Sequence, residues 1–218
     1  MTLAIFDLDN TLIAGDSDHL WGCFLCEEGL VDSADFARRN EAFYRDYQQG
    51  TLDIEAYLRF ALSPLAGRSP QQLADWHARF MRRVIEPIIL PAGRALIADH
   101  RARGHTLLII TATNEFITRP IANTLGIEHL LACEAEQVNG HYTGEPRGIP
   151  SYREGKVTRL DHWCGQHGEA VAGAWFYSDS HNDLPLLERV DKPVAVDPDE
   201  RLRAHALRAG WPVISLRD

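Results

Sequence analysis

Two aspartates stand one residue apart near the start of the chain, in the segment FDLDNTL. Asp7 and Asp9 come directly after LAIF, an apolar run of the kind that forms a buried strand. Asp179 and Asp183 follow a second such run, AWFYS, in the segment SDSHND. Carboxylate oxygens that gather beyond strand ends are the ligands that Mg²⁺ prefers, and their mutual repulsion calls for a cation. The pattern therefore predicts a magnesium site that includes Asp7, Asp9 and Asp179.

Groups suited to binding an anion occur at two other places, one at a strand end and one at the start of a helix. Thr111 ends a third apolar run, in LLIITATN, so that its hydroxyl and the amide of Ala112 reach the same edge of the sheet. Lys156 lies at the start of a predicted helix, in REGKVTRL. A hydroxyl, backbone amides and an ammonium beside a divalent cation suit a tetrahedral dianion such as phosphate.

Each of these features also has an ordinary structural explanation. A lone D-x-D pair is often a turn cap or surface charge, and Thr111 alone could simply end a strand. Lys156 alone could be a solvated helix residue, and Asp179 and Asp183 could cap the helix that follows them. We favour the functional interpretation because all four segments occur in order at strand ends or at a helix start.

The elements that must position these residues alternate along most of the chain. Apolar runs bounded by turn residues predict strands, and repeats of apolar residues at three and four predict helices between them. This alternation predicts an α/β fold, a Rossmann-like doubly wound parallel sheet. Asn139-Gly140 predicts an additional antiparallel hairpin. The predicted strands lie near residues 3–7, 107–111, 175–179, 193–196 and 212–216.

One long segment breaks the alternation and contains only helical patterns. Helices are predicted from Asp16 or Ser17 to Gly29, at 33–50 and at 53–62, and a fourth opens at Ser69, where Gln72 completes a capping box. The sequence thus predicts an α/β core of residues 1–14 and 91–218 with an inserted all-helical cap domain, 15–90.

The composition narrows the possible partners and compartment. The 218 residues carry a formal net charge of −9 with 45% hydrophobic residues, and there is no basic run, so nucleic acid is an improbable partner. No apolar stretch approaches the roughly 20 residues of a membrane span, and we expect a cytoplasmic protein. The four cysteines are expected to be packing residues, as is Trp21. The oligomeric state, monomer or homodimer, stays open.

These motifs resemble those of haloacid dehalogenase superfamily phosphatases, in the phosphoserine-phosphatase-like branch with a helical type-one cap. DLDNTL matches the first motif, Thr111 the second, Lys156 the third and SDSHND the fourth. The resemblance implies that Asp7 is a nucleophile that forms an aspartyl phosphate and that Asp9 is the acid and then the base. It also implies Mg²⁺ bound by Asp7, the backbone carbonyl of Asp9 and Asp179, with Asp183 in support.

The substrate is expected to be a small phosphate ester that the cap selects. Asp16, Asp18 and His19 are the cap residues expected to lie nearest to the nucleophile, and the two carboxylates favour a cationic leaving group. The alternative explanation is structural: Asp16 would cap the helix, and Asp18 would be stabilised by the helix dipole in the first turn. TATN stands where phosphoserine phosphatases usually have a glycine pair. Histidinol phosphate is therefore preferred, with phosphoserine or another small phosphomonoester as the alternative.

Two other functions are compatible with the same residues. A phosphotransferase or mutase would pass the phosphoryl group of Asp7 to an acceptor other than water. A binding protein that had lost catalysis is a more remote alternative, because Asp7 and Asp9 are both present.

Overall fold

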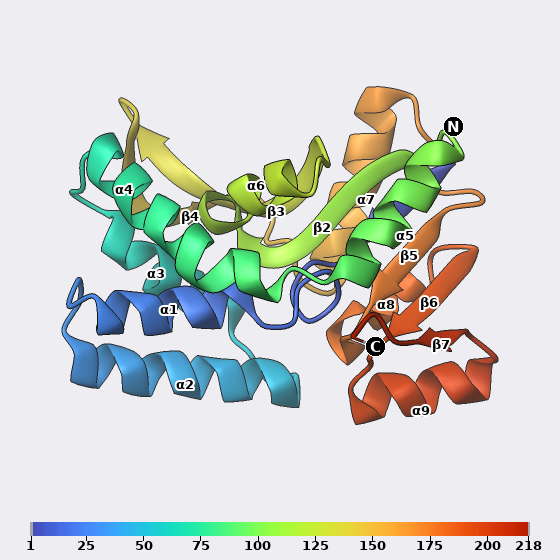
Figure 1. The fold of residues 1–218 in the computed structure, drawn as a ribbon, viewed down its shortest axis with the longest axis horizontal. Helices are drawn as coiled ribbons and strands as arrows, with labels where there is room; N and C mark the ends of the chain where they lie inside the picture. The colour runs from blue at the N-terminus through green and yellow to red at the C-terminus, as the bar shows by residue number, and fades with distance from the viewer. Residues whose placement is uncertain (1, 218) are drawn as a thin grey trace.

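A mostly parallel sheet of seven strands forms the centre of the molecule, in the order β4-β3-β2-β1-β5-β6-β7. The computed structural model describes residues 2–217, and Figure 1 shows the sheet with helices packed around it. All neighbours pair in parallel except β3 and β4. The strands are β1 (Leu3–Phe6), β2 (Thr106–Asn114), β3 (His129–Val138), β4 (His141–Arg147), β5 (Trp175–Ser178), β6 (Lys192–Val196) and β7 (Val213–Ile214).

Strand β1 is buried on both faces, as expected for the middle of a doubly wound sheet. Its side chains alternate between two apolar clusters: Ala4 and Phe6 belong to one, and Leu3 and Ile5 to the other. Helices α5 (Pro91–Ala102) and α6 (Glu115–Thr124) contribute to the first cluster, and α7 (Glu154–His167), α8 (Leu184–Leu187) and α9 (Glu200–Ala209) to the second. The predicted fold class is confirmed.

The chain between β1 and α5 is helical, as the sequence predicts. In Figure 1 these helices, blue to green, lie beside one end of the sheet. The predicted capping box is present, because Ser69 and Gln72 bond each other's backbone N–H groups. The main helices are α1 (Ser17–Glu27), α2 (Ser33–Gln49), α3 (Ile54–Leu62) and α4 (Pro70–Phe80), with short helical turns at 63–65 and 81–88.

The predicted hairpin is present, but its first strand also belongs to the main sheet. Its first strand, β3, begins at His129, where it pairs in parallel with Leu108 of β2, and only its later half pairs with β4 across the Asn139-Gly140 turn. Leu131, Ala132 and Cys133 of the earlier half are buried in the core, whereas the later half becomes exposed at Gln137 and Val138. The polar, alternating pattern visible in the sequence thus marks only the exposed half of this strand. Helices α6 and α9 also lie outside the sequence-based prediction.

Trp21 and the cysteines behave mainly as packing residues. Trp21 is 2% exposed, and its ring contacts Phe24, Phe80 and Phe116. All four cysteines are free; two are buried and two, both on α1, are half-buried. No helix among residues 2–217 is both long enough and apolar enough to cross a bilayer.

Candidate active site

The sheet brings the predicted carboxylates of β1 and β5 to one edge. Asp7 directly follows β1, and its N–H donates to the carbonyl of Tyr177 on β5 at 2.9 Å. The hydroxyl oxygen of Thr11 lies 3.4 Å from Asp7 Oδ2 and 3.1 Å from Asp179 Oδ1, and it accepts the N–H of Asp179 at 3.1 Å. Thr11 therefore holds two carboxylates, 172 positions apart in the sequence, around a single oxygen.

Lys156 connects the nucleophile candidate to Asp183. Its Nζ lies 2.9 Å from Asp7 Oδ1 and 2.7 Å from Asp183 Oδ1, and all three side chains are at most 5% exposed. Ser178 Oγ donates to Asp183 Oδ2 at 2.7 Å. Burial disfavours the ammonium, but the charges of Asp183 and Asp7 outweigh this effect and raise the pKa of Lys156. The lysine is thus a fixed positive charge beside Asp7.

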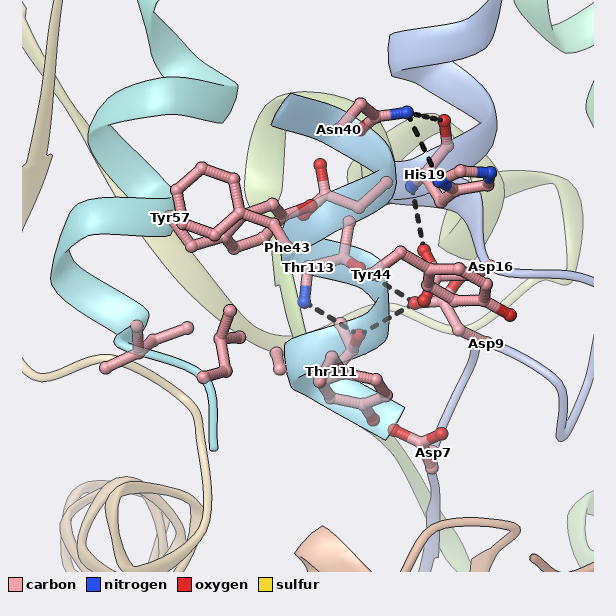
Figure 2. A pocket seen from close by; sticks show the side chains of 15 residues that line it. Asp7, Asp9, Asp16, His19, Asn40, Phe43, Tyr44, Tyr57, Thr111 and Thr113 are labelled. Atoms are coloured by element: carbon pink, nitrogen blue, oxygen red, sulfur yellow. Dashed lines mark hydrogen bonds between the residues drawn. The ribbon is translucent and has the colours of Figure 1, made fainter. Parts of the chain in front are cut away.

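Asp9 is held between β2 and the start of α1. Its Oδ1 accepts the N–H of Ser17 at 2.6 Å, and its Oδ2 accepts the hydroxyls of Thr113 at 2.8 Å and Thr111 at 3.3 Å, as Figure 2 shows in part. Burial, followed by the charge of Asp16, raises the pKa of Asp9 to about 6. Burial also raises the pKa of Asp7 to about 7. Asp9 is therefore placed where a proton can be exchanged near neutrality.

Threonine hydroxyls contribute more to the site than the sequence-based prediction includes. Thr111 and Thr113 are two residues apart on β2, so their side chains lie on the same face of the strand. The N–H of Thr113 also donates to Thr111 Oγ1 at 3.1 Å. Thr113 and Thr11 were not predicted, although the T-x-T spacing and the threonine of DLDNTL are visible in the sequence.

A pocket lies next to Asp7 and Asp9, and residues of α1, α2 and α3 form its other walls. It contains about 490 Å³ of space, part of which is open to solvent, with the two aspartates at one end and Phe43 and Tyr57 at the other (Figure 2). The predicted residues Asp7, Asp9, Asp16, Asp18, His19, Thr111 and Ala112 all line it, together with Asn40, Phe43, Tyr44, Tyr47, Leu52, Ile54, Tyr57 and Thr113. Lys156, Asp179 and Asp183 are not among the lining residues, but Lys156 contacts Asp7 and Asp183, and Thr11 connects Asp179 to Asp7.

Two of the three cap residues have structural roles in addition to their place in the pocket. Asp16 caps α1, where its Oδ1 accepts the N–H of His19 at 2.8 Å. The ring of His19 stacks on Tyr44 with centroids 4.4 Å apart, and its carbonyl accepts a bond from Asn40 at 2.9 Å. The capping explanation and the pocket explanation therefore both hold for Asp16.

Asp18 differs from its two neighbours. It is 5% exposed, its Oδ1 lies 3.4 Å from the amide nitrogen of Asn114, and its Oδ2 has no hydrogen-bond partner among the described residues. Burial, followed by the charge of Asp16, raises the pKa of Asp18 well above its usual range. An oxygen without a partner in the pocket wall is available to a ligand.

The carboxylates beside Thr11 suit a divalent cation. Burial, then the charges of Asp7 and Asp183, raises the pKa of Asp179 well above its usual range, so the negative charges here lack a sufficient counter-charge. Among residues 2–217 no three or more His, Cys, Asp or Glu side chains are grouped as a metal site. The predicted ligand set needs only the side chains of Asp7 and Asp179 with the carbonyl of Asp9, and these donors fit Mg²⁺.

Comparison with known sequences places the chain among hydrolases. The family model described as haloacid dehalogenase-like hydrolase matches residues 4–188. A histidinol-phosphatase of Neisseria meningitidis serogroup C is 48% identical over 219 residues, which cover 99% of both chains. The phosphoserine phosphatase SerB1 of Mycobacterium tuberculosis is 31% identical over 217 residues, 98% of this chain and 70% of its own length.

Solved structures agree with this relationship. A protein with unknown function from Bordetella pertussis Tohama I has a TM-score of 0.92 and 44% identity, with coverage of 99% of this chain and 100% of the other. A phospho-aspartyl intermediate analogue of phosphoserine phosphatase has a TM-score of 0.71 at 17% identity, covering 100% of this chain and 94% of the other, and this likeness shows the fold alone. The chain belongs to the haloacid dehalogenase-like hydrolases, in the phosphatase branch that resembles phosphoserine phosphatase.

Proposed function

We propose that the protein hydrolyses a small phosphomonoester through an aspartyl phosphate on Asp7. The observation that carries this proposal is the buried contact of Asp7 with Lys156, 2.9 Å away; the hydroxyl of Thr111 on β2 contacts the neighbouring Asp9. One Asp7 oxygen attacks phosphorus in line as the bond to the leaving alcohol breaks. Lys156, the hydroxyl of Thr111 and the amide of Ala112 hold the phosphoryl oxygens.

Asp9 moves the protons in both half-reactions. In its protonated form it donates to the leaving alkoxide, and as a carboxylate it then accepts a proton from the water that attacks the aspartyl phosphate. Its pKa of about 6 supports this exchange. The bonds from Ser17 and Thr113 orient its carboxyl group between the β2 hydroxyls and the pocket.

A magnesium ion belongs to this proposal. Asp7, Asp179 and the backbone carbonyl of Asp9 would hold it, and Asp183 would support the site through Lys156 or water. When bound, Mg²⁺ supplies positive charge that stabilises the transferring phosphoryl group. Thr11 orients both carboxylates, because its hydroxyl contacts Asp7 and Asp179 directly.

The pocket supports a cationic alcohol as the leaving group. Among the described residues that line it are four aspartates and several aromatic rings, but no lysine or arginine. Such a lining suits an ammonium or imidazolium and offers no lysine or arginine to pair with a carboxylate. Histidinol phosphate carries an amine and an imidazole without a carboxylate, whereas phosphoserine carries one. We therefore propose histidinol phosphate, in agreement with the similarity of this chain to the histidinol-phosphatase of Neisseria meningitidis.

The helical segment 15–90 is proposed to act as a cap domain over residues 1–14 and 91–218. Its helices supply Asp18, Phe43 and Tyr57 to the pocket, while the core supplies Asp7 and Thr111. A closed cap keeps water away from the phosphoryl group until the alcohol has left.

The test is phosphate release from histidinol phosphate, phosphoserine and p-nitrophenyl phosphate, each with Mg²⁺ or with EDTA. We expect turnover that requires the metal and favours histidinol phosphate over phosphoserine, and Asp7→Asn should remove it. Asp75→Asn, an exposed aspartate of α4, is the matched control and should retain activity. Absence of release from every ester would refute the hydrolase proposal, and a preference for phosphoserine would refute the choice of substrate.

A further inference from the structure

The C-terminal end of α2 is held by side chains of the α/β core. The last turn reads DYQQ and offers no cation to its own free carbonyl groups. In Figure 1 this end of α2 points toward α8 and α9. Three carbonyl groups accept bonds from the core: Tyr47 O from Asn182 Nδ2 at 3.0 Å, Gln49 O from Arg201 Nη1 at 2.8 Å, and Gly50 O from Arg153 Nη2.

The C-terminal end of α2 lies so close to the core that a side chain on Gly50 would contact His181 and Arg153. Gly50 ends α2 with a φ of 72°, and a Cβ there would lie 2.7 Å from His181 Nε2 and 2.9 Å from Arg153 Nη2. Glycine is therefore favoured both by the left-handed backbone and by the close contact with the core.

Two of the three donors lie close in sequence to Lys156 and Asp183 of the proposed site. Asn182 immediately precedes Asp183, is 2% exposed, and accepts the hydroxyl of Tyr152 at 3.1 Å. It also accepts the Nε of Arg153 at 3.3 Å. Arg153 occupies the position immediately before α7, whose first turn carries Lys156. The side chains that hold α2 thus belong to the segments that carry Asp183 and Lys156.

Arg153 has a backbone conformation that few non-glycine residues adopt, with φ 50° and ψ −122°. Such a conformation persists only where surrounding contacts maintain it. Here the guanidinium bonds both Gly50 O and Asn182 Oδ1, so the strained residue lies at the junction between α2 and the core.

Helix α2 also forms one wall of the pocket. Asn40, Phe43, Tyr44 and Tyr47 recur at intervals of three and four and line the pocket together. The hydroxyl of Tyr47 lies 3.4 Å from Ser180 Oγ in the loop after β5. Fixing the C-terminal end of α2 therefore fixes the position of this wall relative to Asp7.

We propose that Arg153 and Asn182 are positioning residues that keep the α2 wall closed over the pocket and tie it to Lys156 and Asp183. The kinetic part of this inference rests on the proposed function. We expect the binding of a substrate whose alcohol contacts α2 to depend on these bonds, and the folding of the sheet not to depend on them.

The test uses Arg153→Gly and Asn182→Ala, with Arg208→Ala on the exposed side of α9 as the control. Glycine at position 153 removes the guanidinium and relieves the strained backbone, so the variant is expected to fold. Amide hydrogen exchange in residues 33–50 should rise about tenfold, the effect of losing one charge-assisted hydrogen bond. KM for histidinol phosphate should rise by a similar factor while kcat changes little, and Arg153→Lys should restore part of the loss.

Several outcomes would overturn the inference. One is unchanged exchange in α2 together with unchanged KM. Another is a rise in exchange that extends equally through β1 and β2, because that pattern would indicate a general loss of stability. If wild type releases phosphate from no ester, the proposed function fails, but the exchange measurement still decides whether Arg153 and Asn182 hold α2.

Discussion

Asp18 is a buried carboxylate of α1 with one oxygen that has no partner among the described residues. Its pKa is raised by burial and by the charge of Asp16, so the folded protein disfavours the ionised form. In the unfolded chain an aspartate ionises near pH 3.9. At neutral pH folding must therefore protonate Asp18 or bury its charge, and either process reduces the free energy of unfolding. A cationic substrate would reverse this effect.

Asp18→Asn should therefore stabilise the protein and impair its specificity. We expect a higher Tm at pH 7, about 2–4 °C for each kcal/mol regained in a chain of this size. The value of kcat/KM should fall about tenfold or more for histidinol phosphate, but little for the uncharged alcohol of p-nitrophenyl phosphate. Thermal melts and steady-state kinetics measure both effects. A lower Tm, or an equal loss with both substrates, would contradict the role given to Asp18.

Lys156 is the single cation in contact with Asp7 and Asp183 among the described side chains. Lys156→Ala would leave two buried carboxylates facing each other, and the expected cost is about 3–5 kcal/mol in the free energy of unfolding. Urea denaturation at pH 7 measures it, with Lys192→Ala as the exposed control. A loss no larger than that of the control would show that the buried pair contributes nothing to stability.

At the scale of elements, α1 and α2 pack closely where Gly22 faces Asn40. A Cβ at Gly22 would lie 2.5 Å from Asn40 Oδ1, and Asn40 is held by its bond to the carbonyl of His19. Gly22→Ala should thus separate the two helices and lower the free energy of unfolding by about 1–3 kcal/mol. Because Asn40 lines the pocket, KM for the substrate should rise as well.

Gly165 provides the matched control within α7. A Cβ there would meet nothing within 4 Å, and its backbone is helical. Gly165→Ala should therefore stabilise the protein by up to about 1 kcal/mol, the difference in helix propensity. Chemical denaturation of both variants tests the comparison, and the close contact at Gly22 would be disproved if the two substitutions had the same sign.

At the scale of the whole molecule, buried histidines affect how stability changes with pH. His100 is 1% exposed, with Nε2 2.8 Å from the hydroxyl of Tyr177 and Nδ1 2.7 Å from His105 Nδ1. Burial, followed by the charge of His105, lowers the pKa of His100 to about 4. Between pH 4 and 6.5 the unfolded chain binds a proton there that the folded protein does not, so stability falls as the pH falls through this window.

His100→Gln should therefore lose less stability than wild type when the pH is lowered from 7 to 5. The expected difference is on the order of 2 kcal/mol, from about 1.4 kcal/mol for each pH unit below 6.5. Urea unfolding at the two pH values measures it, and the exposed His141→Gln serves as the control. Parallel losses in all three proteins would mean that His100 does not contribute.

Much of the fold and part of the site could be predicted because the relevant signals are local. Asp7, Thr111 and Asp179 each stand at or next to the end of an apolar run, and the carboxyl ends of parallel strands meet at one edge. The strand β3 could be predicted only in its exposed half. Its buried half, HLLAC, contains only a short apolar run, and its parallel pairing with β2 is seen only in the structure.

The α/β class, the helical segment after β1 and the residue types of the site can be read from the sequence alone, because periodicity and turn signals act over a few neighbouring residues. Which of these residues contact one another depends on the packing of the whole chain. Asp9 reaches Thr113 across 104 positions, and Arg153 reaches Gly50 across 103. Contacts at such separations depend on how the sheet and helices pack, and so does the burial of Asp18 in the pocket wall.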